Sequence, residues 1–128
     1  MINTESMSFW SNFNKPAIHK DWSVLSSVGQ LDEILEESNS QKVAILKHST
    51  RCGISYMVKD QLESTWDIPI GDLKLYYLDL LAHRDVSDEV ARRLRVVHQS
   101  PQIIVIHRSK AIYNTSHHAI NLRGLKSV

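Results

Sequence analysis

One short apolar run, Val43-Ala44-Ile45-Leu46, constrains the fold of this chain more than any other segment. Four consecutive apolar residues place hydrophobic side chains on both faces of a strand, because successive side chains point to opposite sides. Such a strand lies inside a sheet that is covered on both faces, as in proteins that alternate strands and helices. The segment 42–47 therefore predicts a central strand with helices packed on both faces of its sheet.

The pattern around this run alternates between helix and strand. Helices are expected over four segments, namely 27–38, 52–65, 88–94 and 116–121. Strands are expected over 42–47, 73–80, 102–107 and 111–115, after a short extended segment near 22–25. The last two strands are separated only by a short turn at 108–110, which indicates a hairpin. This order predicts an α/β three-layer fold, with a central mixed β-sheet flanked by helices on both faces.

Apolar spacing and capping chemistry assign some individual side chains. In the second helix, Tyr56 and Leu62 are expected to face inward. Ser87 is the expected N-cap of the third helix, because a hydroxyl can accept a hydrogen bond from an unpaired backbone N–H. Residues 123–128 are expected to fray.

Length, charge and cysteine usage suit one domain in the cytoplasm. We expect an irregular segment over 1–21 and a single domain over 22–128. The formal net charge of +1 gives no bias toward nucleic acid, and no apolar run is long enough to span a membrane. Residues 1–13 lack the pattern of a secretory signal, and a single cysteine suits a reducing compartment. We therefore expect a cytoplasmic monomer that binds neither nucleic acid nor membrane.

The single cysteine, Cys52, stands between the predicted central strand and the helix that follows it. A thiol at that place faces the unpaired N–H groups and the positive dipole end of the helix, and Arg51 adds a neighbouring cation. These features favour the thiolate, which is the reactive form of cysteine. The polar residues Ser49 and Thr50 argue against a buried structural cysteine, so Cys52 is the candidate nucleophile.

A lone thiol limits the redox chemistry that is open to this chain. Ser55 stands three residues after Cys52, where dithiol redox proteins carry their resolving cysteine. Its hydroxyl cannot form a disulfide. It can donate a hydrogen bond to the thiolate, or it can form a hydrogen bond with the backbone of the first helical turn. A single thiol attacks a disulfide and keeps one partner as a mixed disulfide, which a second thiol from solution must release.

Two other places are candidates for the same site. Ser100-Pro101 precedes an apolar run, and proline there marks the first residue of a strand or an edge strand. The Ser100 backbone would then be free to bind an extended peptide or a small thiol. His48 could support the thiolate, although a simple strand-end role fits it equally well. No metal site is expected, because the adjacent His117-His118 pair has poor geometry for chelation on a helix.

Three segments of the chain together resemble one known family. They are 47–55, which contains Cys52, the segment Tyr77-Leu78-Asp79-Leu80, and 98–102, which contains Pro101. The combination resembles the YtxJ-type (BrxC) monothiol bacilliredoxins of the thioredoxin-like superfamily, over about 22–120. The resemblance implies a thioredoxin-like fold, a cytosolic bacterial protein and a role in cell redox homeostasis.

The resemblance also implies roles for particular residues. Cys52 is implied as the catalytic nucleophile, and Pro101 as a cis-proline beside it. The active-site loop and helix start are implied to be Thr50, Arg51, Gly53, Ile54 and Ser55. The implied reaction is the removal of bacillithiol from S-bacillithiolated client proteins, without a bound cofactor. Bacillithiol or another low-molecular-weight thiol would be the co-substrate, and another redoxin could act as reductant.

Two alternatives to this thiol–disulfide oxidoreductase stay open. The tetrapeptide 52–55 also resembles the Cys-Gly-Phe-Ser motif of monothiol glutaredoxins that carry iron–sulfur clusters. Because such a cluster needs four ligands, one cysteine per chain would require a dimer and two external thiols. The second alternative is a non-catalytic thioredoxin-like binding module, which an unreactive Cys52 would indicate.

Overall fold

The computed structural model of this chain describes residues 18–128, so most of the expected segment 1–21 lies outside the described residues. The strands are β1 (Ser23–Val24), β2 (Val43–His48), β3 (Lys74–Asp79), β4 (Gln102–His107) and β5 (Lys110–Ser116). The helices are α2 (Val28–Glu37), α3 (Gly53–Thr65), α4 (Arg84–Leu94) and α5 (Leu122–Lys126), with a 3₁₀ turn η1 (His117–Ala119) before α5. No helix in this part of the chain has the length and apolar character that a membrane span requires.

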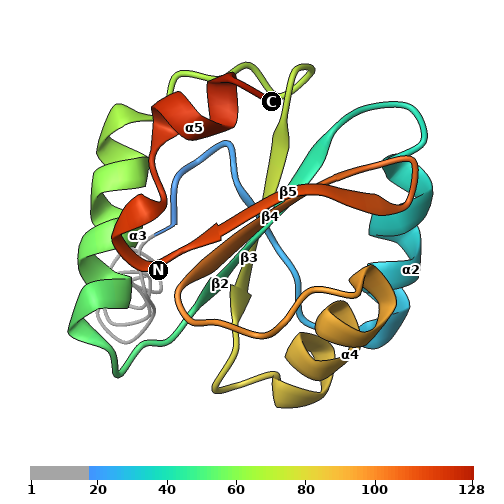
Figure 1. Ribbon diagram of the computed structural model, residues 1–128, viewed down its shortest axis with the longest axis horizontal. Coiled ribbons are helices and arrows are strands. Elements are labelled where there is room, and N and C mark those ends of the chain that lie inside the picture. The colour runs from blue at the N-terminus through green and yellow to red at the C-terminus, as the bar shows by residue number, and fades with distance from the viewer. Residues whose placement is uncertain (1–17) are drawn as a thin grey trace, which may run out of the picture.

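The strands form one mixed sheet in the order β1-β3-β2-β4-β5. β1, β3 and β2 run parallel, whereas β4 is antiparallel to β2 and β5 is antiparallel to β4. Helices α3 and α5 cover one face of the sheet, and α2 and α4 cover the other (Figure 1). This arrangement confirms the three-layer α/β fold that the sequence predicted.

β2 is the central strand, and all of its residues are buried. Val43 and Ile45 pack in the core beneath α2 and α4, whereas the alternate residues of the run pack in the core beneath α3 and α5. The alternation continues past the apolar run, so that Lys47 points toward α4 and His48 toward α3. Because both polar side chains are fully buried, each needs hydrogen-bond partners inside the protein.

Helix α4 begins earlier than the sequence predicted. It starts at Arg84, so the expected cap Ser87 lies inside the helix and is buried. The additional turn brings Val86 into the core together with Val90. Burial of this apolar side chain explains the earlier start, because it extends the apolar face of the helix by one turn.

The prediction for Tyr56 was wrong, because its side chain is 59% exposed. The buried face of α3 is instead formed by Ser55, Val58, Lys59 and Leu62, which follow the spacing of one helical stripe. Two of these residues, Ser55 and Lys59, are polar. Apolar spacing therefore chose Tyr56 as the first inward residue, whereas the buried stripe begins one residue earlier, at Ser55.

The C-terminal residues were also predicted incorrectly. Leu122–Lys126 form α5, where a frayed end was expected. Asn121 caps this helix by accepting the N–H of Gly124 at 2.8 Å, and Leu125 is buried against the sheet. The segment expected as a final helix, 116–121, contains only the short turn η1.

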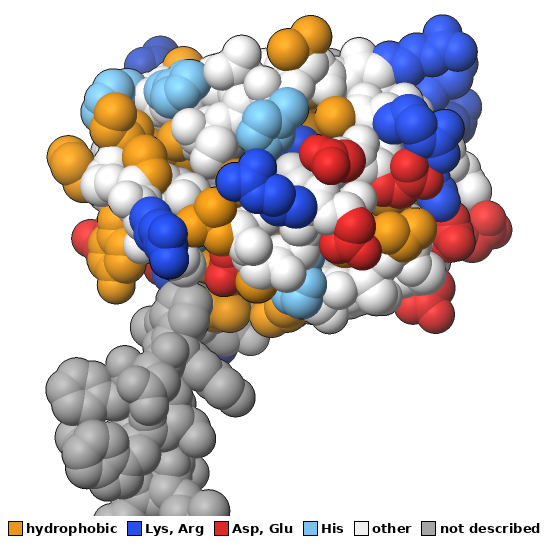
Figure 2. All heavy atoms as spheres, turned by 90° about the horizontal axis from the view of Figure 1, so that it is seen from below, with side chains coloured by type: hydrophobic (Ala, Val, Ile, Leu, Met, Phe, Trp, Pro, Cys, Tyr) orange, Lys and Arg blue, Asp and Glu red, His pale blue; other side chains and the backbone are white. Residues whose placement is uncertain are grey.

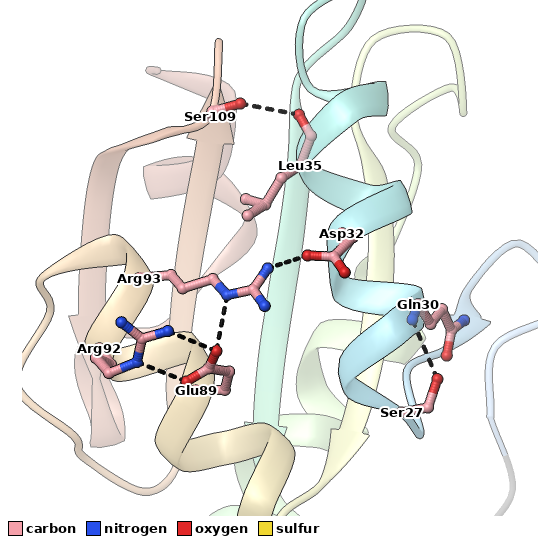
Figure 3. A network of polar contacts seen from close by, with 8 residues as sticks. All are labelled: Ser27, Gln30, Asp32, Leu35, Glu89, Arg92, Arg93 and Ser109. Carbon is pink, nitrogen blue, oxygen red and sulfur yellow. Dashed lines mark hydrogen bonds and ion pairs between the residues drawn. The ribbon is translucent and has the colours of Figure 1, made fainter.

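An ion-pair network on the surface joins α2 to α4 (Figure 3). Arg93 of α4 bonds Asp32 of α2 and also Glu89 of its own helix, the latter at 2.9 Å. Arg92 bonds Glu89 through two contacts of 2.7 Å, and both lie within α4. Arg93 is therefore the arginine of this pair that links the two helices on this face of the sheet.

We predict that Arg93→Met lowers the urea midpoint of unfolding more than Arg92→Met does. The first substitution cuts a bridge between two helices, whereas the second removes contacts within one helix. Urea unfolding followed by circular dichroism measures both midpoints. The difference between the two variants should shrink in high salt, because exposed ion pairs are screened. Equal midpoints at low salt would show that the bridge between the helices contributes nothing.

Candidate redox site

Cys52 lies at the edge of the sheet where β2 ends and α3 begins. It is the N-cap of α3, with an extended backbone (φ −107°, ψ 120°), and its carbonyl accepts the N–H of Tyr56 at 3.0 Å. The thiol is half-buried, and within residues 18–128 no side-chain hydrogen bond caps the helix from it. Four of the five other residues expected in this loop and helix start are exposed, namely Thr50, Arg51, Gly53 and Ile54, whereas Ser55 is buried. An accessible thiol at a helix N-terminus has the surroundings of a nucleophile.

The loop before β4 reaches the same edge of the sheet. The strand register pairs Gln102 with Lys47, so Pro101 lies beside the end of β2. The peptide bond between Ser100 and Pro101 is cis, as the family resemblance implied. The carbonyl of Pro101 accepts the N–H of His117 at 3.0 Å, which attaches η1 to this loop. The fold therefore brings both loops that the sequence singled out to one edge.

Ser55 makes no hydrogen bond to the thiol in this structure, although the sequence allowed one. It is fully buried, because it belongs to the inward stripe of α3. Its Oγ accepts the N–H of Ser49 at 3.0 Å and lies 3.1 Å from Nδ1 of His48. The position that carries a second thiol in dithiol proteins is thus occupied by a hydroxyl that binds the end of β2.

His48 is enclosed beneath α3. Its ring packs against Tyr56 and Tyr77, with ring centroids 6.1 and 5.5 Å away. Burial is the largest cause that lowers the pKa of His48 to about 4, and Lys59 lowers it further, whereas Asp79 raises it. At physiological pH the imidazole is therefore neutral, so it does not place a positive charge beside the thiolate.

Lys47 is the counterpart of His48 on the opposite face of the sheet. Its side chain is fully buried, and its Nζ lies 3.1 Å from the carbonyl oxygen of Ser87 and 3.2 Å from Nδ1 of His98. Burial lowers the pKa of Lys47 to about 8, although Asp88 raises it. Lys47 ties the end of β2 to α4 and to the loop before β4. Sequence reasoning missed this role, although two polar residues that close a buried strand were a usable signal.

An open hollow of about 400 Å³ lies next to the Cys52 loop. It is lined by Thr50, Arg51, Asp79, Leu81 and Ala82. Asp79 is occupied in the turn after β3, where its Oδ1 accepts the N–H groups of Leu81 and Ala82. Arg51 forms no ion pair with any residue of the described chain, so its guanidinium can meet an anionic group of a substrate.

Figure 2 shows this end of the molecule from below, where β2 and β3 lead into α3 and α4. Hydrophobic side chains gather on the α3 side of the view, whereas acidic and basic side chains gather on the α4 side. The exposed apolar residues of α3 are Ile54, Tyr56 and Met57. The first of these lies two residues from Cys52, so the thiol borders an apolar surface.

Within residues 18–128, no group of three or more His, Cys, Asp or Glu side chains is arranged to hold a metal ion. His117 and His118 both lie in η1, and both side chains are exposed. The expectation that the chain uses no metal stays a prediction.

Comparisons with known proteins show the family and the fold of this chain. The family model described as monothiol bacilliredoxin BrxC matches residues 23–125. A solved structure described as a candidate oxidoreductase with a thioredoxin fold is 33% identical, with a TM-score of 0.71, and the match covers 84% of this chain and 92% of that chain.

Two thioredoxins are more distant in sequence. That of Malassezia sympodialis is 18% identical with a TM-score of 0.66, and the match covers 89% of this chain and 93% of that chain. That of Fasciola hepatica is 16% identical with a TM-score of 0.62, and the match covers 82% of this chain and 93% of that chain. At these identities the two thioredoxins show the fold alone, which is the thioredoxin fold.

We predict that acidification destabilises the protein partly through His48. Because the folded pKa is about 4 and the ordinary value is 6.5, the unfolded chain binds more protons between these two pH values. The stability from the neutral ring is therefore complete above pH 6.5 and is lost as the pH falls toward 4, by at most about 3 kcal/mol. Urea unfolding at several pH values measures this loss of stability. The His48→Asn variant has no imidazole and should lack this part of the pH dependence. Parallel curves for both proteins would contradict the prediction.

We predict that Lys47 makes the free energy of unfolding depend on pH in the alkaline range. The folded pKa of about 8 lies below the ordinary 10.5, so the unfolded chain binds more protons within that window. Stability relative to Lys47→Met should therefore rise with pH between 8 and 10.5, by at most about 3 kcal/mol. The measurement is the difference between the unfolding free energies of the two proteins at each pH. A difference that stays constant across the window would mean that the buried amine does not titrate there.

Proposed function

Because this chain belongs to the monothiol bacilliredoxin BrxC family, we propose that it removes bacillithiol, or a related low-molecular-weight thiol, from mixed disulfides on client proteins. The family and the thioredoxin fold support thiol redox chemistry, and the proposal adds the substrate and the direction of the reaction. The observation that carries it is the half-buried thiol of Cys52 at the start of α3, with a buried hydroxyl in place of a second thiol.

The first step is a thiol–disulfide exchange. The Cys52 thiolate attacks the sulfur of the small thiol within the mixed disulfide, and a new S–S bond forms between them. The bond between the small thiol and the client breaks, and the client leaves as a thiolate that takes a proton from solvent. The attacking sulfur stands at the N-cap of α3, and Arg51 precedes it in the chain.

The second step needs a thiol from outside the chain. A second molecule of the small thiol attacks the small-thiol sulfur carried on Cys52, which releases the Cys52 thiolate and a disulfide of two small thiols. Another redoxin could supply the reducing thiol instead. Ser55 cannot replace either reductant, because a hydroxyl forms no disulfide and this one is bonded to His48 and Ser49.

The surroundings of the thiol suit both halves of such a substrate. The apolar surface formed by Ile54, Tyr56 and Met57 borders Cys52 and can accept a protein client. The hollow beside Arg51 offers a cation to an anionic group of the small thiol. The Ser100 backbone before the cis peptide bond can receive an extended segment of the client.

We predict that reduced protein mixed with a peptide carrying bacillithiol in a mixed disulfide gains the mass of one bacillithiol and releases the free peptide. The expected product follows because the first exchange leaves the small thiol on Cys52. Intact-mass spectrometry measures both products. A peptide carrying glutathione, tested alongside, shows which small thiol is preferred.

Cys52→Ser is the matched control, because it removes only the nucleophilic sulfur. It should form no adduct and release no peptide. If it released peptide at the wild-type rate, the proposal would be overturned. A coloured preparation after anaerobic purification would favour the cluster carrier, and a folded protein that forms no adduct with either peptide would favour the binding module.

A further inference from the structure

His48 is the residue at this site that the exchange mechanism leaves without a role. It is fully buried at the end of β2, so it cannot touch a client or a small thiol. Its neutral ring offers no charge to the thiolate, and no hydrogen bond joins it to Cys52 among the described residues. If His48 affects the reaction, it does so through another residue.

The connection runs through the hydroxyl of Ser55. Nδ1 of His48 lies 3.1 Å from Ser55 Oγ, and the same oxygen accepts the N–H of Ser49 at 3.0 Å. One atom therefore joins the last residue of β2, the first residue of the turn and the first turn of α3. Cys52 lies midway between Ser49 and Ser55 in sequence.

The backbone of Cys52 is held within this connection from both sides. Its N–H donates to the carbonyl oxygen of Ser49 at 3.2 Å, and its carbonyl accepts the N–H of Tyr56 at 3.0 Å. These two hydrogen bonds tie the backbone that carries the thiol to Ser49 on one side and to the first turn of α3 on the other. The Ser55 hydroxyl holds Ser49, and His48 is a buried partner that holds this hydroxyl in place.

We propose that His48 is a positioning residue that acts through the Ser55 hydroxyl to hold the Ser49–Cys52 turn in the conformation from which the thiolate attacks. The inference deepens the proposed function and rests on it for the identity of the natural substrate. A small displacement of a reacting atom costs a large factor in rate, because the attack requires alignment with the disulfide. Loss of the link therefore lowers the rate of attack more than it weakens substrate binding.

The test measures single-turnover attack of Cys52 on the bacillithiol–peptide disulfide and, separately, on dithiodipyridine, which releases a coloured thione. His48→Phe keeps a ring and removes the hydrogen bond, and Ser55→Ala removes the hydroxyl. Each should lower the rate at saturating substrate by about tenfold to a hundredfold, with little change in the half-saturating concentration. The combined variant should be no slower than the slower single variant, because both break the same link.

Two control variants separate positioning from simple destabilisation. His48→Asn places an amide near the position of Nδ1 and should recover most of the rate. Tyr77→Phe removes a buried hydroxyl that has no hydrogen-bond partner in the described chain, beside the same ring. It should keep the rate within about twofold of the wild type.

Two results would overturn the inference. One is a wild-type rate in folded His48→Phe, and the other is additive losses in the combined variant. If His48→Phe does not fold, the rate of Ser55→Ala relative to the wild type tests the same link. That substitution removes only the hydroxyl and leaves the His48 ring in place. Reaction with dithiodipyridine but not with the bacillithiol peptide would defeat the proposed function alone. The dithiodipyridine rates of the same variants would then decide the positioning role.

Discussion

The site depends on two polar side chains that are buried at the end of the central strand. A buried polar group is costly unless it is hydrogen-bonded, so Lys47 and His48 each require a partner within the protein. Because neighbours on a strand point to opposite faces, the two residues find partners on opposite sides of the sheet. Lys47 reaches His98 in the loop before β4, and His48 reaches Ser55 at the start of α3. The end of β2 thus holds both loops of the site.

A thiol at the start of a helix gains reactivity from the backbone rather than from a charged side chain buried beside it. Cys52 is the N-cap of α3, where the helix dipole presents its positive end, and the nearest buried imidazole is neutral. The chemistry is therefore set by where the turn places the sulfur. With Ser55 buried under the helix, the position that carries a second thiol in dithiol proteins holds a hydroxyl, and Cys52 is the single cysteine of the sequence.

Much of the fold and the centre of the site could be predicted because they depend on local patterns. The apolar run of β2 and the place of Cys52 at a strand-to-helix junction are visible in neighbouring residues. The errors occurred where a distant contact decided the outcome. Helix α4 begins at Arg84 because Val86 is buried against the sheet, and Leu125 stabilises α5 by packing on strands far away in the sequence.

The sequence by itself determined the element order, the layered architecture, the place of the single thiol at a strand-to-helix junction and the lack of a second thiol. Periodicity and residue chemistry are sufficient for these, since each is a property of a short segment. Only the tertiary structure decided which way Ser55 points and which groups meet the buried His48 and Lys47. Those contacts join residues whose proximity depends on the register of the strands and the packing of helices on both faces, which no short segment contains.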